Sequence, residues 1–228
     1  MADVNVAGQL DEIEKRIMAG LKDFQRATVN RIDELYRAGQ MRVLVSDEVG
    51  LGKTLIARGT IAKLAKLQKE SGDKLVKVVY VCSNASIAEQ NLNKLRITSE
   101  LKTESTSSSR LSMQHLNIFR QENDTEMLNR YIQLIPLTPD TSFRMTSGAG
   151  IVSERALMYA ILRRMPELSM YRKALEVAMA DKAVGQWDGW ARDWYETQVK
   201  ECDKTSGGKY LAYMLDKLSV ELNMRADE

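Results

Sequence analysis

Apolar residues recur at steps of three and four in the first part of the chain, which is the period of one face of an α-helix. The positions that share this face are Leu10, Ile13, Ile17, Leu21 and Phe24. A second helical stretch follows over about residues 25–37, and Gly39 is a plausible stop for it. The pattern therefore predicts two consecutive helices at the start of the chain.

Three apolar runs further along have the composition of strands. "MRVLVS" (41–46) is expected to form a short buried strand, with glycines just beyond it. "KLVKVVYVCS" (74–83) is β-branched and nearly continuous, which is typical of a strand that is covered on both faces. "YIQLIPL" (131–137) is a candidate for another strand.

Helices are predicted between these strands. Apolar spacing supports a helix from Lys53 to about Lys69, and "NASIAEQNLNKL" (84–95) reads as another, with Asn84 or Ser86 as its N-cap. Alternation of strands and helices implies a parallel sheet with right-handed crossovers.

From Ile151 onward the pattern is helical. We therefore predict an α/β protein in three parts. Residues 1–40 form N-terminal helices, residues 41–147 form a P-loop α/β domain with a parallel sheet, and residues 148–228 form a mostly helical segment.

Composition narrows the class of protein. Of 228 residues, 44% are apolar and only three are proline, so a core can form and helices are favoured. The net charge of +2 neither demands nor excludes a nucleic-acid partner. Two cysteines indicate a reducing, cytoplasmic location, and a single histidine, His115, argues against a metal site. No run approaches the ~20 apolar residues that span a bilayer.

The stretch "VLVSDEVGLGKTLIARG" (43–59) carries the clearest chemistry. It combines an expected strand, a glycine-rich loop and a helix, which is how a chain binds a nucleotide phosphate at a helix N-terminus. Gly50 and Gly52 let the backbone approach the phosphates, Lys53 reaches the β- and γ-phosphates, and Thr54 holds Mg²⁺.

Asp47 occupies the position where the strict phosphate-loop pattern has glycine. The flanking strand and helix support the motif in spite of it. "VLVSDE" also has the form of a Walker B strand that ends in a carboxylate pair. We reject that interpretation because "GLGKT" follows directly, and one turn cannot serve both ends of the nucleotide.

"SDEVGLGKT" resembles motif I of superfamily-two helicases and translocases of the DEAD/DEAH and Swi/Snf-like type, whose domains are RecA-like. "LKDFQRATVNRI" (21–32) is similar to the Q motif of that superfamily. The resemblance implies that Gln25 reads the adenine edge and Phe24 packs near the base. It also implies that the loop and its immediate neighbours surround the phosphates of ATP. These residues are Val49, Gly50, Leu51, Gly52, Lys53, Thr54 and Leu55.

Two further segments follow in the order of that family. "VVYVCSNASIAEQNLNKL" (78–95) resembles motif Ia, and "LTPDTSFR" (137–144) is similar to motif Ib. The resemblance implies that these segments contact nucleic acid, and DNA is the expected form. The contact residues that it implies are Ser83, Asn84, Thr138 and Pro139. A group of prokaryotic helicases has a comparable "TPxTSF … G … ER" segment, matched here by Gly148 or Gly150 and by Glu154 and Arg155.

Part of the helicase pattern is missing from this sequence. No apolar run after residue 54 ends in the Asp-Glu of motif II, and no second motor domain that would supply arginine fingers is present. We therefore expect the N-terminal part of a helicase or translocase, ending before motif II, that binds ATP and Mg²⁺ with little hydrolysis of its own.

Two other functions stay open. One is an interaction module that uses ATP as a switch or structural ligand, and the other is a P-loop kinase or another nucleotide-handling enzyme. In the helical segment, Trp187, Trp190 and Trp194 lie on one predicted helix face, where they either stack bases or, more commonly, pack in a core or interface. A basic group is either a phosphate-binding patch or a solvated surface; its members are Arg163, Arg164, Arg172 and Lys173.

Overall fold

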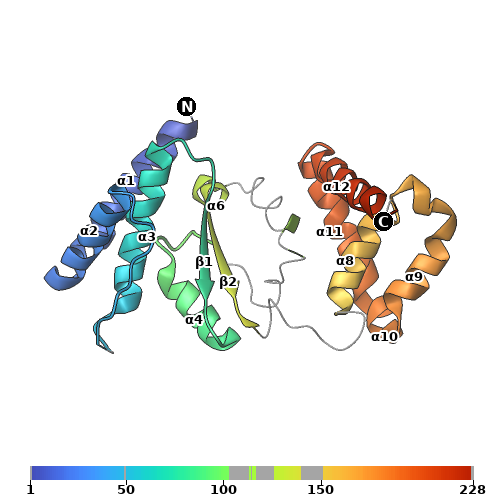
Figure 1. Cartoon of the computed structure of the whole chain (residues 1–228), viewed down its shortest axis with the longest axis horizontal. Coiled ribbons are helices and arrows are strands. Elements are labelled where there is room, and N and C mark those ends of the chain that lie inside the picture. The colour runs from blue at the N-terminus through green and yellow to red at the C-terminus, as the bar shows by residue number, and fades with distance from the viewer. Residues whose placement is uncertain are drawn as a thin grey trace. The chain divides into compact units, whose positions relative to one another are not determined.

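The structure is a computed structural model that describes residues 2–48, 50–102, 113, 115–116, 126–139 and 151–226 (Figure 1). Helices and strands follow one another in the order α1 (Ala2–Ala19), α2 (Asp23–Arg37), α3 (Lys53–Glu70), β1 (Val76–Val81), α4 (Ala85–Leu95), α6 (Met127–Tyr131), β2 (Ile132–Leu137), α8 (Val152–Leu162), a 3₁₀ helix (Pro166–Tyr171), α9 (Arg172–Ala180), α10 (Val184–Gln186), a π-helical turn (Trp187–Ala191), α11 (Arg192–Thr205) and α12 (Lys209–Ala226).

The chain divides into two compact units. The first unit contains α1 to α4, α6 and both strands, and the second contains α8 to α12. The N-terminal helices α1 and α2 thus belong to the same unit as α3 and the sheet.

A two-stranded parallel sheet lies in the first unit. β1 pairs with β2 in a register that runs from Val76 opposite Ile132 to Val81 opposite Leu137, which confirms the predicted parallel pairing. β2 is buried along almost its whole length. β1 is not, because Val79 and Val81 are 50% and 66% exposed. The prediction that β1 is covered on both faces is therefore wrong: only alternate residues enter the core.

Residues 41–46 do not form the predicted buried strand. Met41 and Leu44 are 69% and 88% exposed, while Val43 and Val45 pack against a small core of α2 and α3. A strand needs a neighbour for its backbone N–H and C=O groups. Among the described residues β1 pairs with β2 alone, and a cavity of about 340 Å³ is lined both by the valines of this segment and by β1.

The predicted apolar face of the N-terminal helices is confirmed at four of its five positions. Leu10, Ile13 and Ile17 are buried in one core with the Ala62 side of α3, and Leu21 packs in the neighbouring core of α2 and α3. Phe24 is the exception at 44% exposure. It lies in the first turn of α2, after the break that ends α1, so it no longer continues the same face.

Ion pairs join the three helices at the rim of this core. Lys66 of α3 bridges Asp11 and Glu14 of α1, at 2.7 and 3.1 Å. Lys63 bridges Glu14 at 3.1 Å and Asp33 of α2 at 3.6 Å. The carboxylates beside it raise the pKa of Lys66, above all through its hydrogen bond to Asp11.

The second unit is helical, as the sequence predicts. Its largest core cluster joins α8, α11 and α12 through Leu157, Ile161, Val199 and Tyr210. A second cluster packs around Trp187, whose side chain is 2% exposed.

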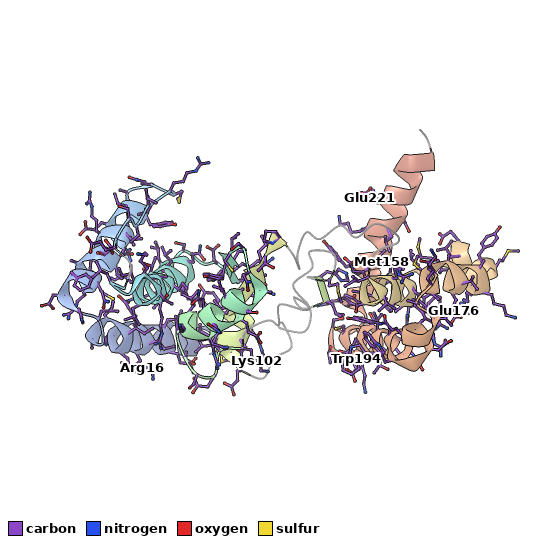
Figure 2. The ribbon with its side chains drawn as sticks, turned by 90° about the horizontal axis from the view of Figure 1, so that it is seen from below. Arg16, Lys102, Met158, Glu176, Trp194 and Glu221 are labelled. Atoms are coloured by element: carbon purple, nitrogen blue, oxygen red, sulfur yellow. The ribbon has the colours of Figure 1, made fainter. Side chains whose placement is uncertain are left out.

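The tryptophan face is therefore divided. Trp187 has the core role, whereas Trp190 and Trp194 are 47% and 55% exposed. Figure 2 labels Trp194, which lies on α11. The members of the basic group also differ in availability. Arg164 makes a bidentate ion pair with Glu196, at 2.7 and 3.1 Å, and is therefore not available to a phosphate. Arg172 and Lys173 are exposed.

Candidate nucleotide and nucleic-acid site

The glycine-rich loop leads directly into α3. Gly50 and Gly52 have φ angles of +91° and +81°, in the left-handed region that favours glycine. Gly52 is the N-cap of α3, and a Cβ atom added there would lie 2.6 Å from Nε2 of Gln25. The backbone conformation therefore favours glycine at position 52, and a side chain there would also have to displace the Gln25 amide.

Lys53, the first residue of α3, folds back over the loop. Its exposed ammonium group donates hydrogen bonds to the backbone carbonyls of Asp47 and Glu48, at 2.6 and 2.7 Å. These carbonyls are weak partners for a full positive charge compared with the oxygens of a phosphate. The Lys53 ammonium group thus lies beside the N-terminus of α3. There it can leave the two carbonyl oxygens and bind an anion instead.

The beginning of α3 supplies the other groups of an anion site. The first N–H groups of a helix have no acceptor within it, and the helix dipole makes that end positive. Thr54 is half-buried in the first turn, and Leu51 and Leu55 are partly exposed beside it. The Leu55 N–H donates to the Gly52 carbonyl at 2.8 Å. Val49 lies outside the described residues.

Gln25 reaches the same loop from α2. Its side chain is 4% exposed; Oε1 accepts a hydrogen bond from the Lys22 N–H at 3.1 Å, and Nε2 donates to the Leu51 carbonyl at 2.9 Å. The structure therefore places Gln25 against the loop, while the neighbouring Phe24 side chain is partly exposed.

Sequence reasoning did not anticipate the two bonds of Gln25. One signal was present, because a glutamine at the third position of a helix is half of a capping box, in which its side chain accepts from the N-cap backbone. Lys22 in place of the usual serine or threonine at the N-cap obscured that signal.

The four predicted nucleic-acid contacts meet at the carboxyl end of the sheet. Ser83 and Asn84 follow β1, Thr138 and Pro139 follow β2, and the Cys82 N–H still donates to the Leu137 carbonyl at 3.2 Å. Both arrows of Figure 1 point to this end.

The four residues differ in access. Ser83, Asn84 and Pro139 are exposed, whereas Thr138 is fully buried, so its side chain does not reach the surface in this conformation. Asn84 also has a structural role, because its Oδ1 accepts hydrogen bonds from the N–H groups of Ser86 and Ile87. These bonds confirm Asn84 as the N-cap of α4.

The structure describes only some of the remaining motif residues. Gly148 and Gly150, like residues 140–144, lie outside the described residues. Glu154 and Arg155 are in the first turn of α8. Arg155 is buried, and its guanidinium donates to the Ala180 carbonyl at 3.1 Å, so it is engaged in the second unit's own packing.

The residues present fit a magnesium nucleotide. The site has two left-handed glycines, a lysine over the loop and a hydroxyl in the first helical turn, which are the kinds of group that phosphate loops use for phosphates and Mg²⁺. In the parts of the chain that the structure describes, no group of three histidine, cysteine or acidic residues could hold a metal ion.

None of the described helices is long and apolar enough to span a membrane.

A parallel α/β unit with a glycine-rich loop that opens a long helix is typical of nucleotide-binding proteins. The sequence profile of the type III restriction enzyme res subunit matches residues 19–135, which is more than half of the chain. The chain therefore belongs to this family, whose domain is helicase-like and has a RecA-like fold. No curated protein and no solved structure matches the chain.

Proposed function

We propose that this chain is the ATP-binding first motor domain of a superfamily-two helicase or translocase of the Swi/Snf-like, prokaryotic type, and that it acts on DNA. The observation that carries the proposal is the Lys53 ammonium group, which lies over a loop of two left-handed glycines at the start of α3. That loop lies within the region that belongs to the helicase-like family.

Each loop residue then has a defined role. The backbone N–H groups at the start of α3 receive the phosphates, and Lys53 leaves the carbonyls of Asp47 and Glu48 to neutralise the β- and γ-phosphates. Thr54 contributes its hydroxyl to Mg²⁺, which neutralises charge on the phosphate oxygens when bound.

The chain by itself is proposed to bind ATP with little turnover. Phosphoryl transfer depends on positioning and on charge neutralisation by a carboxylate-held metal and by arginine. In this sequence no strand-like run after the loop ends in an acidic pair. A brisk ATPase rate that Lys53→Ala abolishes would contradict this part of the proposal.

Nucleic acid is proposed to bind at the carboxyl end of the sheet, at Ser83, Asn84 and Pro139. These residues are exposed and follow neighbouring parallel strands, so they lie at the same edge of the sheet. Thr138 would take part through its backbone, because its side chain is buried.

The test is magnesium-dependent ATP binding, measured by titration calorimetry. We expect the wild-type chain to bind Mg–ATP and Lys53→Ala to bind at least tenfold more weakly, because one charge-assisted contact contributes about 1.5–3 kcal/mol. Lys94→Ala is the matched control, since Lys94 is an exposed lysine of α4 in the same unit.

Equal affinity for all three proteins would reject the proposed nucleotide site. Single-stranded and duplex DNA are then added to the ATP-loaded chain. ATP binding that neither form of DNA changes would favour the alternative, a module that uses ATP as a switch.

A further inference from the structure

We propose that the surface along α9, in the second unit, is a binding site for single-stranded nucleic acid. It consists of one exposed aromatic ring and three exposed cations, which we call the α9 tract: Tyr171, Arg172, Lys173 and Lys182. This inference goes beyond the proposed function, because it concerns the other unit and needs no nucleotide. It uses the membership of the chain in a helicase-like family to favour nucleic acid over an acidic protein.

The cations of the α9 tract are available to a ligand. All three are exposed, and in the described part of the chain none of them takes part in an ion pair. The same stretch of sequence also contains two acidic residues, Glu176 and Asp181, so its charge along the sequence is nearly balanced. Whether the surface is positive therefore depends on where these two carboxylates lie.

Both carboxylates are engaged by side chains of α8 and α11. Glu176, which Figure 2 labels, accepts hydrogen bonds from Arg192 at 3.1 Å and from the Tyr159 hydroxyl at 3.2 Å. Asp181, directly after α9, lies 3.7 Å from the guanidinium of Arg155. The tertiary structure thus gives each acidic side chain a partner outside the tract and leaves the three cations to solvent. Exposed cations of this kind bind phosphate groups.

Tyr171 gives the tract a surface on which a base can stack. It is 60% exposed and directly precedes two of the cations, and the neighbouring Met170 is 87% exposed. Proteins bind single strands with this combination, because unpaired bases stack on the ring while the phosphates contact the cations. In a duplex the faces of the bases are covered by their neighbours, so the tract favours a single strand.

The opposite side of α9 holds the tract in place. Leu175, Met179 and Ala180 pack in the core cluster around Trp187. The Ala180 carbonyl also accepts a hydrogen bond from Arg155 at 3.1 Å, which ties the end of α9 to α8. The cations are therefore carried by a packed helix, and binding does not require this helix to become ordered first.

The first experiment measures the affinity for a labelled single strand of about 12 nucleotides, and for the same strand in a duplex, by fluorescence anisotropy without ATP. One variant replaces the three cations of the α9 tract by glutamine. The matched control replaces three exposed lysines of α11 and α12 by glutamine, so that the net charge changes equally; these are Lys204, Lys209 and Lys217.

We expect the α9 variant to bind the single strand about tenfold more weakly at low salt, and the control to change less than about twofold. The slope of log affinity against log salt concentration should become shallower by about 2, since each phosphate contact to a single strand contributes about 0.7. Equal losses in the two variants would reveal charge attraction without a site and would overturn the proposal. Absence of binding by the wild type would overturn it as well.

Tyr171 separates base stacking from charge attraction. Tyr171→Ala should weaken binding of the single strand about fivefold or more and leave binding of the duplex unchanged, whereas Tyr171→Phe should bind like the wild type. Tyr213→Ala is the matched control, because Tyr213 of α12 is similarly exposed at 51%. The same loss for single strand and duplex would contradict stacking on this ring.

Photo-cross-linking distinguishes the α9 tract from the edge of the sheet in the first unit. A single strand that carries thiothymidine is irradiated on the wild-type chain, and the product is digested with trypsin. We expect label on the peptide of residues 165–172, which contains Tyr171. Label confined to the first unit would overturn the proposal. If the chain failed to bind Mg–ATP, the proposed function would fail while this label still decided the role of α9.

Discussion

The hydroxyl group of Tyr131 donates a 2.9 Å hydrogen bond to the backbone carbonyl of Ala65, 66 residues earlier in the chain. Tyr131 ends α6 immediately before β2, and Ala65 lies in the middle of α3. The bond therefore ties the entry to the second strand to the helix that begins at the phosphate loop. Burial raises the pKa of Tyr131 to about 12, and the negative charge of Asp73 adds to the shift.

This pKa predicts a loss of stability in alkaline solution. The folded-state value lies above the value of about 10 for an unfolded tyrosine, so the folded protein keeps its proton longer than the unfolded chain does. The contribution of Tyr131 is complete below pH ~10 and is lost as the pH rises toward 12. Urea unfolding of wild type and Tyr131→Phe between pH 8 and about 11.5 measures it.

At pH 8 we expect Tyr131→Phe to be less stable by about 1 kcal/mol, because one buried hydrogen bond is lost. Above pH ~10 the wild type should lose stability more steeply than the variant, since phenylalanine cannot ionise. Parallel curves for the two proteins would contradict the coupling of this phenol to folding.

A pair of helical glycines gives a second prediction. A Cβ atom at Gly59 of α3 would lie 2.9 Å from Cγ2 of Val29 and 3.2 Å from Cδ1 of Leu21, whereas one at Gly8 of α1 would meet nothing within 4 Å. Gly59→Ala should lower the free energy of unfolding by about 1–3 kcal/mol through overpacking between α2 and α3.

Gly8→Ala is the matched control and should raise the free energy of unfolding by about 0.5–1 kcal/mol, because alanine favours the helix and the site has room. Chemical denaturation compares the two variants. The same sign for both would mean that α2 and α3 do not approach each other closely at Gly59.

The divided tryptophan face provides a third prediction. Trp187 is 2% exposed and packs edge-on against Tyr159 at 5.3 Å between ring centroids, whereas Trp194 is 55% exposed. Trp187→Ala should destabilise the second unit by about 3–5 kcal/mol, and Trp194→Ala by less than about 1 kcal/mol. Thermal unfolding followed by far-ultraviolet circular dichroism distinguishes them, and equal losses would contradict the different burial of the two rings.

Two substitutions of Asn84 separate its structural role from its proposed role in binding nucleic acid. Asn84→Asp keeps the oxygen that caps α4, so stability should be unchanged, but it adds a negative charge at the proposed nucleic-acid edge. Asn84→Ala removes the cap and should cost about 1 kcal/mol. We expect the aspartate variant to bind DNA several-fold more weakly at low salt, measured by fluorescence anisotropy. Unchanged binding would place the contact elsewhere.

The sequence by itself determined the features that depend on neighbouring residues along the chain. The helix period predicted α3 and the β-branched run predicted β1, and the structure confirms both. Asn84 and Ser86 were the two candidate caps of α4, of which the structure selects Asn84. The glycines of the loop belong here too, since left-handed backbone angles at Gly50 and Gly52 are a local requirement.

Tertiary structure alone decided the features that depend on partners distant in sequence. Residues 41–46 have the composition of a strand but find no strand partner among the described residues, so half of their apolar side chains stay exposed. Likewise, Thr138 is buried, and the Gln25 amide is committed to Lys22 and to a loop carbonyl 26 residues away. The local sequence pattern indicates which residues prefer burial or strand pairing. The packing of α2, α3 and the sheet determines which of these residues are in fact buried or paired.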